Sequence, residues 1–208
     1  MNKQELIKRV EDFVRDNISS HDGGHDWWHI NRVRNLALYI STAEGTCDLQ
    51  SVEISALLHD IGDAKFRKGN EDDHVSGIRQ LLEYLNLNKK TIEEVIFVNE
   101  NISFRKGERP RLVSPEFMAV QDADRLDAIG AIGIARAFNY GGYINNTIWD
   151  PEGLQPSTIA HFYDKLLRLK DLMNTETGRK IADERHRYLE SFLVQFYNEW
   201  KTGDKSQV

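Results

Sequence analysis

Histidine and aspartate residues that suit a metal ion occur in three separate segments of the chain. His59 and Asp60 are adjacent within an apolar segment, where both need polar partners. His29 precedes them and Asp124 follows them, each in a segment of its own. Neutral imidazoles and carboxylates are suitable ligands for divalent cations such as Zn, Mn, Fe and Ni. If the segments converge, the four side chains could hold one ion and leave positions open for water and a phosphoryl oxygen.

Two of these segments are predicted to be helices that direct the histidines inward. Asp26 is a suitable N-cap for a helix on which His29 begins an apolar series at three- and four-residue spacing. A second helix, over about residues 50–64, should carry the His–Asp pair and Asp63 along one edge. Three polar side chains on one helix edge need a common ligand or partner.

Asp124 is expected on a third, longer helix. Pro115 suits its first turn after Ser114, and the apolar pattern continues to about residue 138. Asp124 and Asp127 fall on the inward stripe, where acids are costly unless they bind a metal or buried donors. Small residues in its second half allow either a close helix approach or ordinary packing: Ala128, Gly130, Ala131, Gly133 and Ala135.

The remaining apolar repeats predict an all-α fold of about seven to nine helices. Further helices are expected at residues 3–17 and 91–102, with two more between residues 157 and 200. Loops are expected at residues 105–110 and 139–156, and the second loop is long enough to be a functional lid.

Length and charge limit the class of protein. We expect a single domain over residues 1–208, or a main domain with a small helical subdomain. The motifs would lie within about residues 20–140, and cover helices within about residues 157–200. A net charge of −6 argues against a nucleic-acid polymer as partner, but it permits a local basic pocket for a phosphorylated small molecule.

The sequence also favours a reducing compartment. Cys47 is the only cysteine, so an intrachain disulfide is excluded. No apolar run has the length of a membrane span, and the polar first residues are unlike a signal peptide. We therefore expect a cytoplasmic location and no membrane partner.

Three motifs together resemble the HD superfamily of metal-dependent phosphohydrolases. That family has a first histidine, a later adjacent His–Asp pair and a distant aspartate on another helix. Matching residues lie at 25–29, 59–63 and 121–128, and the resemblance spans most of residues 25–170. It implies a helical HD-domain fold in which one divalent metal is bound by His29, His59, Asp60 and Asp124.

More narrowly, the chain is similar to bacterial HD-domain hydrolases, some of which use Mn(II) to convert nucleoside triphosphates to monophosphate and pyrophosphate. The resemblance therefore favours manganese as the cofactor, although Fe, Ni, Co and Zn accept the same ligands. It also implies a homodimer as one arrangement of the chain.

Asp63 is the candidate catalytic base. It follows Asp60 by three residues, where the (p)ppGpp-hydrolase branch of the superfamily tends to carry an acid, and it could orient water or accept its proton. The alternative is a helix C-terminal cap or a salt bridge with Lys65. His74 lies in an acidic stretch and is expected in a solvated loop, with a second-metal or substrate contact as the alternative.

Several cationic and aromatic residues are candidates for binding the substrate. Lys65 and Arg125 could clamp phosphate oxygens or form surface ion pairs, and the same holds for Arg67 and Arg136. Tyr140 could contact a sugar or base, or simply belong to a turn.

Three further residues could complete such a site. His161 and Lys165 are four residues apart, so they could reach a phosphate tail together or form the polar edge of a cover helix. Asp127 lies one turn after Asp124 and could orient a ligand histidine or Arg125.

The ligand set and the resemblance predict a metal-dependent phosphohydrolase that acts on nucleotides. The leading reaction converts a (deoxy)nucleoside triphosphate to monophosphate and pyrophosphate. A nucleotidase or phosphodiesterase is the alternative among enzymes, and a metal- and nucleotide-binding regulatory module without turnover is the alternative outside them. A two-metal oxygenase would need further histidines after the His–Asp pair, and His74 alone is available there.

Overall fold

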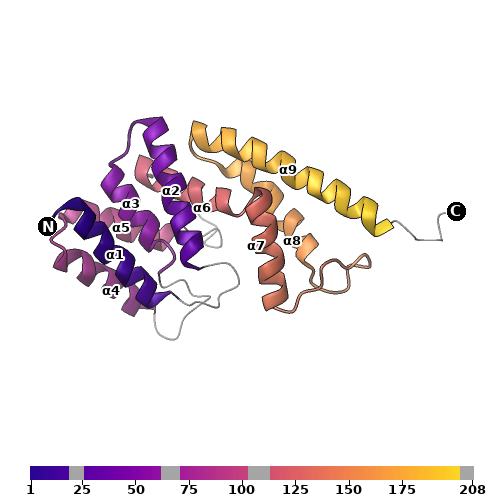
Figure 1. The fold of residues 1–208 in the computed structure, drawn as a ribbon, viewed down its shortest axis with the longest axis horizontal. Coiled ribbons are helices and arrows are strands. Elements are labelled where there is room, and N and C mark those ends of the chain that lie inside the picture. The colour runs from indigo at the N-terminus through magenta and orange to yellow at the C-terminus, as the bar shows by residue number, and fades with distance from the viewer. Residues whose placement is uncertain (19–25, 62–70, 103–112, 202–208) are drawn as a thin grey trace.

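The all-α expectation is confirmed in the computed structural model, which describes residues 1–18, 26–61, 71–102 and 113–201. Within these ranges the chain forms helices joined by turns and has no strand (Figure 1). The elements in chain order are α1 (Lys3–Asn17), α2 (Trp27–Glu44), α3 (Leu49–Leu58), α4 (Glu71–Tyr84), α5 (Lys89–Asn101), α6 (Pro115–Asp127), α7 (Gly130–Tyr143), α8 (Thr158–Asp164), the 3₁₀ helix η3 (Leu166–Leu172) and α9 (Glu176–Lys201). None of the described helices has the length and apolar character that crossing a membrane requires.

Polar side chains fix where the two helices with predicted starts begin. Asp26 accepts a hydrogen bond from the N–H of His29 at 2.8 Å. Ser114 accepts one from the N–H of Phe117 at 2.9 Å. Each cap accepts a hydrogen bond from a backbone N–H group that has no partner within the first turn of the helix. Both predicted starts are therefore confirmed, and they set the register of His29 on α2 and of Asp124 on α6.

Two apolar cores meet along α2 and α3. One core lies among α1, α3, α4 and α5 and includes Ile30 from α2. The other joins α2 and α6 to η3 and α9 and includes Val33 from α2. The first turn of α2 therefore lies where the cores meet, and both α3 and α6 pack against this helix (Figure 1). Side chains at this end of α2 are positioned by both halves of the packing.

The single long helix expected over residues 114–138 is wrong, because the chain breaks into α6 and α7. Ile129 is extended, with φ −128° and ψ 168°, and Gly130 has a left-handed φ of +75°. Glycine adopts that conformation at little cost. Gly133 then lies so close to Ala128 that a Cβ on it would come within 2.3 Å of the Ala128 carbonyl group. The small residues permit this turn, and α7 continues into the stretch expected as a loop.

Three other elements differ from the expectations. α3 ends at Leu58 rather than near residue 64, so His59 and Asp60 lie in the turn that follows the helix. α4 begins in the stretch expected as a solvated loop, and it is held by Ile78 and Leu82, which are fully buried in the first core. The last helix is predicted by the apolar set Ile181, Tyr188, Phe192, Phe196 and Trp200. On α9 the buried residues are instead shifted by one position and are Gly178, Ala182, Leu189 and Leu193.

Candidate active site

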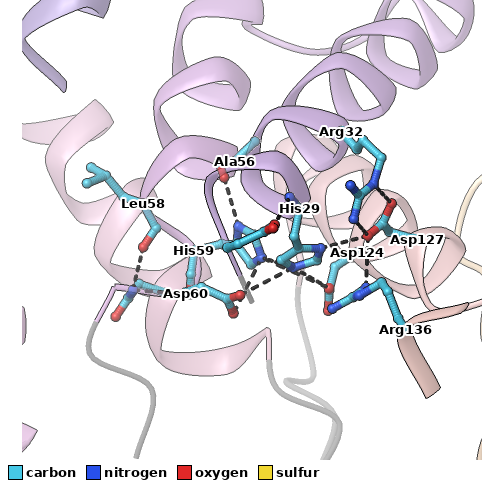
Figure 2. Close-up of polar contacts among 11 residues, drawn as sticks. His29, Arg32, Ala56, Leu58, His59, Asp60, Asp124, Asp127 and Arg136 are labelled. Atoms are coloured by element: carbon cyan, nitrogen blue, oxygen red, sulfur yellow. Dashed lines mark hydrogen bonds and ion pairs between the residues drawn. The ribbon is translucent and has the colours of Figure 1, made fainter. Parts of the chain in front are cut away.

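The four side chains expected as metal ligands lie together between α2, α3 and α6 (Figure 2). His29 comes from the first turn of α2 and Asp124 from the last turn of α6. The carboxylate of Asp60 lies 3.2 Å from Nε2 of His29 and 3.4 Å from Nε2 of His59. Oδ1 of Asp124 lies 3.6 Å and 4.0 Å from the same two nitrogens. Ligand atoms of His29, His59 and Asp124 are all within 4.8 Å of one another, so they could hold a metal ion.

Hydrogen bonds on the outer edges of the two imidazoles determine which ring nitrogens carry protons. Nδ1 of His59 lies 2.8 Å from the carbonyl oxygen of Ala56, which can only accept, so this nitrogen is the donor. Nδ1 of His29 lies 2.8 Å from the Asp127 carboxylate and donates in the same way. In the neutral rings both Nε2 atoms therefore present lone pairs, and these atoms face each other at 3.3 Å. Two lone pairs and two carboxylates around one centre fit a cation.

The surroundings of His29 also favour positive charge. Burial has the largest influence on the pKa of His29 and lowers it, as does the charge of Arg136. Hydrogen bonds with Asp127 and Asp60, together with the Asp60 charge, outweigh both and raise the pKa. The same negative groups attract a divalent ion, which competes with the proton for the ring. The donor set therefore fits a divalent transition metal.

Asp127 orients the ring of His29 and is itself held by two arginines. Its carboxylate accepts hydrogen bonds from Nε and Nη2 of Arg32 at 2.7 and 3.0 Å, and from Nη1 of Arg136 at 2.8 Å. Burial alone would raise the pKa of Asp127, but hydrogen bonds from His29 and Arg32 and the charge of Arg136 hold it well below its usual range. An ionised carboxylate here keeps the proton on Nδ1 of His29. The contact expected between Asp127 and a histidine of the cluster is thus present.

Asn99 on α5 holds the turn that carries the His–Asp pair. Its Nδ2 atom donates to the carbonyl oxygens of Leu58, His59 and Ile61 at 2.7, 3.3 and 3.0 Å. Carbonyl groups at the C-terminus of a helix have no partner within the helix, and Asn99 supplies one. This side chain therefore determines where His59 and Asp60 lie relative to α2.

Asn99→Ala should loosen this turn and weaken metal binding. The variant removes the donor shared by three carbonyl oxygens, so we expect the free energy of unfolding to fall by roughly 1–2 kcal/mol. The affinity for Mn(II) should fall several-fold, and thermal melts and a metal titration measure the two effects. Asn101→Ala is the control, because Asn101 lies on the same helix but donates to Phe97 of its own α5. Equal losses in both variants would contradict the role of Asn99.

Other predicted site residues lie away from the cluster or outside the described part of the chain. Asp63, Lys65 and Arg67 belong to the undescribed residues, as does the side chain of His74. Arg125, expected as a phosphate clamp, is buried and donates to the carbonyl oxygen of Leu172, which directs it toward η3. His161 and Lys165 lie at α8, which packs on α7 and η3 and is on the far side of α7 from α2 (Figure 1).

Asp122 joins the helix of Asp124 to the C-terminal helix and was not singled out from the sequence. Its fully buried carboxylate accepts from the N–H groups of Asn174 and Thr175, each at 2.8 Å, and from the Thr175 hydroxyl at 2.7 Å. The same hydroxyl accepts from the N–H of Gly178 at 2.9 Å and so caps α9. α6 therefore presents one acid to the cluster and another to the start of α9.

Comparisons with known proteins identify the family. The HD domain family matches residues 27–129, which include all four converging side chains. The protein YpgQ of Bacillus subtilis (strain 168) is 40% identical over 199 residues, which is 94% of each chain. The crystal structure of Bacillus subtilis YpgQ in complex with ADP has a TM-score of 0.78 at 38% identity, and covers 93% of this chain and 97% of that chain. An HD-superfamily hydrolase from Bacillus thuringiensis has a TM-score of 0.76 at 39% identity, over 97% and 100% of the two chains.

The helical fold, the cluster of histidines and carboxylates that could hold a metal ion, and these relatives define a metal-dependent phosphohydrolase. The chain belongs to the HD superfamily.

Proposed function

We propose that this protein converts (deoxy)nucleoside triphosphates to monophosphate and pyrophosphate, with Mn(II) as the favoured metal. The observation that carries the proposal is the convergence of two histidine Nε2 atoms and two carboxylates on one centre. A nucleotide substrate is supported by the complex of Bacillus subtilis YpgQ with ADP. The metal would be held by His29, His59, Asp60 and Asp124.

Among the four described side chains of the cluster, the two carboxylates are the exposed ones. The Asp124 side chain is 30% exposed and that of Asp60 is 11% exposed, whereas both imidazole rings are fully buried. A phosphate group can therefore approach the carboxylates while Asp127 and Ala56 hold the rings from behind. A bound divalent metal supplies polarisation of the phosphorus and acidification of water. Arg32 and Arg136 add positive charge beside the cluster, where the charge of the phosphates must be offset.

We assign the remaining roles as proposals from the sequence. Asp63 would accept the proton of the attacking water, and Lys65 would contact a phosphate oxygen, because both follow Asp60 closely in the chain. Tyr140 would contact the nucleoside. The proposed substrate site leaves out Arg125, His161 and Lys165. The described contacts of these residues are with the C-terminal elements.

We also propose that the helices on either side of the cluster work as one domain. The two cores share α2 and α3, and Asp122 ties α6 to α9. Solved relatives match nearly the whole chain. A homodimer stays a prediction, and light scattering of the purified protein measures it.

Product analysis tests the proposed reaction. Metal-stripped protein with Mn(II) restored is incubated with nucleoside mono-, di- and triphosphates and cyclic nucleotides, and the products are separated by ion exchange. Monophosphate plus pyrophosphate from a triphosphate is the expected result. Nucleoside plus inorganic phosphate would instead indicate a nucleotidase, and nucleotide binding without turnover in any metal would indicate a regulatory module.

Mn(II) should raise the melting temperature of the metal-stripped protein. An ion that binds the folded state alone stabilises it by RT ln(1 + [L]/Kd), about 2.7 kcal/mol when its concentration is about a hundred times Kd. Scanning fluorimetry with Mn(II), Ni(II), Zn(II) and Mg(II) measures the shift for each ion. His59→Ala is the control and should show no shift. An equal shift in that variant would place the bound ion elsewhere in the molecule.

A further inference from the structure

One face of α7 carries a row of side chains that begins at the cluster. Arg136, Tyr140 and Tyr143 are spaced by four and then three residues, which places them on the same face of the helix. Arg136 marks the start of the row, because it donates to Asp127 at 2.8 Å beside His29 (Figure 2). The two tyrosines therefore lie on the face of α7 that meets the cluster.

The tyrosines form a paired aromatic surface. Their ring centroids are 6.4 Å apart and the ring planes differ by 32°. Tyr140 is half-buried, whereas Tyr143 is 59% exposed. Figure 2 shows Arg136 and the exposed ligand Asp124 on the same side of the cluster, so the row starts on the side where a phosphate can enter. Aromatic rings at that position suit a nucleobase, which stacks on such side chains.

The length of the row corresponds to one nucleotide unit. At a rise of about 1.5 Å per residue, Tyr140 and Tyr143 lie roughly 6 and 10 Å along the helix axis from Arg136. Helical side chains lean toward the N-terminus, and this end of α7 is the end next to the cluster. A sugar and its first phosphate span this distance. If the terminal phosphorus of a triphosphate lay at the cluster instead, two more phosphates would carry the base past Tyr143, where α7 ends.

We propose that Tyr140 and Tyr143 form a nucleobase platform, and that its distance from the cluster directs attack to the α-phosphorus. This inference rests on the proposed function. In the reaction the water oxygen bonds to the α-phosphorus, and the bond from that phosphorus to the oxygen bridging the α- and β-phosphates breaks. Pyrophosphate leaves with the bridging oxygen and its electron pair. The proton of the water passes to a carboxylate base, for which Asp63 is the proposed residue, and then to solvent.

Substrates with and without a base separate the platform from the hydrolytic site. The double variant Tyr140→Leu, Tyr143→Leu removes the aromatic surface, and the matched double variant with phenylalanine keeps it. For Mn(II)-loaded enzyme, we expect the leucine variant to raise KM for ATP about tenfold or more and the phenylalanine variant to leave it unchanged. KM for inorganic tripolyphosphate and the Mn(II) content should be unchanged in both. Tyr188→Leu, on exposed α9 surface, is the control and should behave as wild type.

Each outcome bears on one of the two proposals. An unchanged KM for ATP in the leucine variant overturns the platform and leaves the hydrolase in place. In water enriched in the heavy oxygen isotope, label in the monophosphate supports attack at the α-phosphorus, and label in pyrophosphate or inorganic phosphate overturns it. If wild type hydrolyses no nucleoside triphosphate of the panel, the proposed function fails, and calorimetry with ADP then decides the platform. A tenfold weaker affinity in the leucine variant supports it, and an equal affinity overturns it.

Discussion

His59→Ala should abolish both metal binding and hydrolysis. The ring supplies one of the two Nε2 atoms that face each other at 3.3 Å, and it is held by the Ala56 carbonyl group. Loss of a partner outside the ligand shell typically costs 10–100-fold in metal affinity, so loss of a ligand should cost more than about 100-fold. We expect no stoichiometric Mn(II) by elemental analysis of the purified variant, and no product above background in the triphosphate assay.

A histidine outside the cluster provides the control for this result. His186 lies on α9, with its Nε2 atom 3.3 Å from Glu190. His186→Ala should keep its Mn(II) and its activity even if its melting temperature falls. Full metal occupancy in His59→Ala would exclude this ring as a ligand, whatever the activity of the variant.

Asp127→Asn should weaken metal binding without removing any of the four proposed ligands. The amide has the shape of the carboxylate but can donate to Nδ1 of His29, which moves the ring proton to Nε2 and aims an N–H group at the metal position. In the wild-type protein Arg32 and Arg136 both bind the negative charge of the Asp127 carboxylate, and the variant removes that charge. We expect the Mn(II) affinity measured by calorimetry to fall about 10–100-fold, as for other groups that orient a ligand histidine.

Asp122→Asn is the matched control because Asp122 is also a buried aspartate on α6. Its partners are Asn174 and Thr175 rather than the cluster. We expect a lower melting temperature in this variant with an unchanged Mn(II) affinity per folded molecule. Equal losses of affinity in the two variants would mean that Asp127 acts only through the stability of α6.

The positions of the two histidines could be predicted because each depends on short-range rules. The Asp26 cap and the apolar spacing determine which side of α2 carries His29. The helix expected to carry His59 ends one residue before it, at Leu58, yet the His59 ring still points inward. His59 has φ −59° and ψ −33°, so the first residue beyond α3 keeps the helical direction.

Two residues that bond to distant main-chain groups could not be predicted from the sequence. Asn99 and Asp122 each bond to main-chain groups more than thirty positions away in the chain. The position of Arg32 near the cluster could have been predicted, because Arg32 lies one turn after His29 on the same helix. The break at Gly130 depends on its left-handed conformation, and a glycine among other small residues fits a continuous helix equally well on pattern alone.

Because Asp122 bonds to the start of α9, the segment that carries the four proposed ligands depends on residues outside it. A fragment ending at residue 129 would keep every proposed ligand, but it would lose the donors of Asn174 and Thr175 and leave a bare carboxylate in α6. Gly178 restricts the residues that can occupy the first turn of α9, because a Cβ at this position would lie 2.4 Å from the Asp122 carboxylate. The start of α9 can therefore vary little in shape, although it supplies none of the four proposed ligands. Transplanting this centre into another scaffold would require moving the start of α9 along with α6.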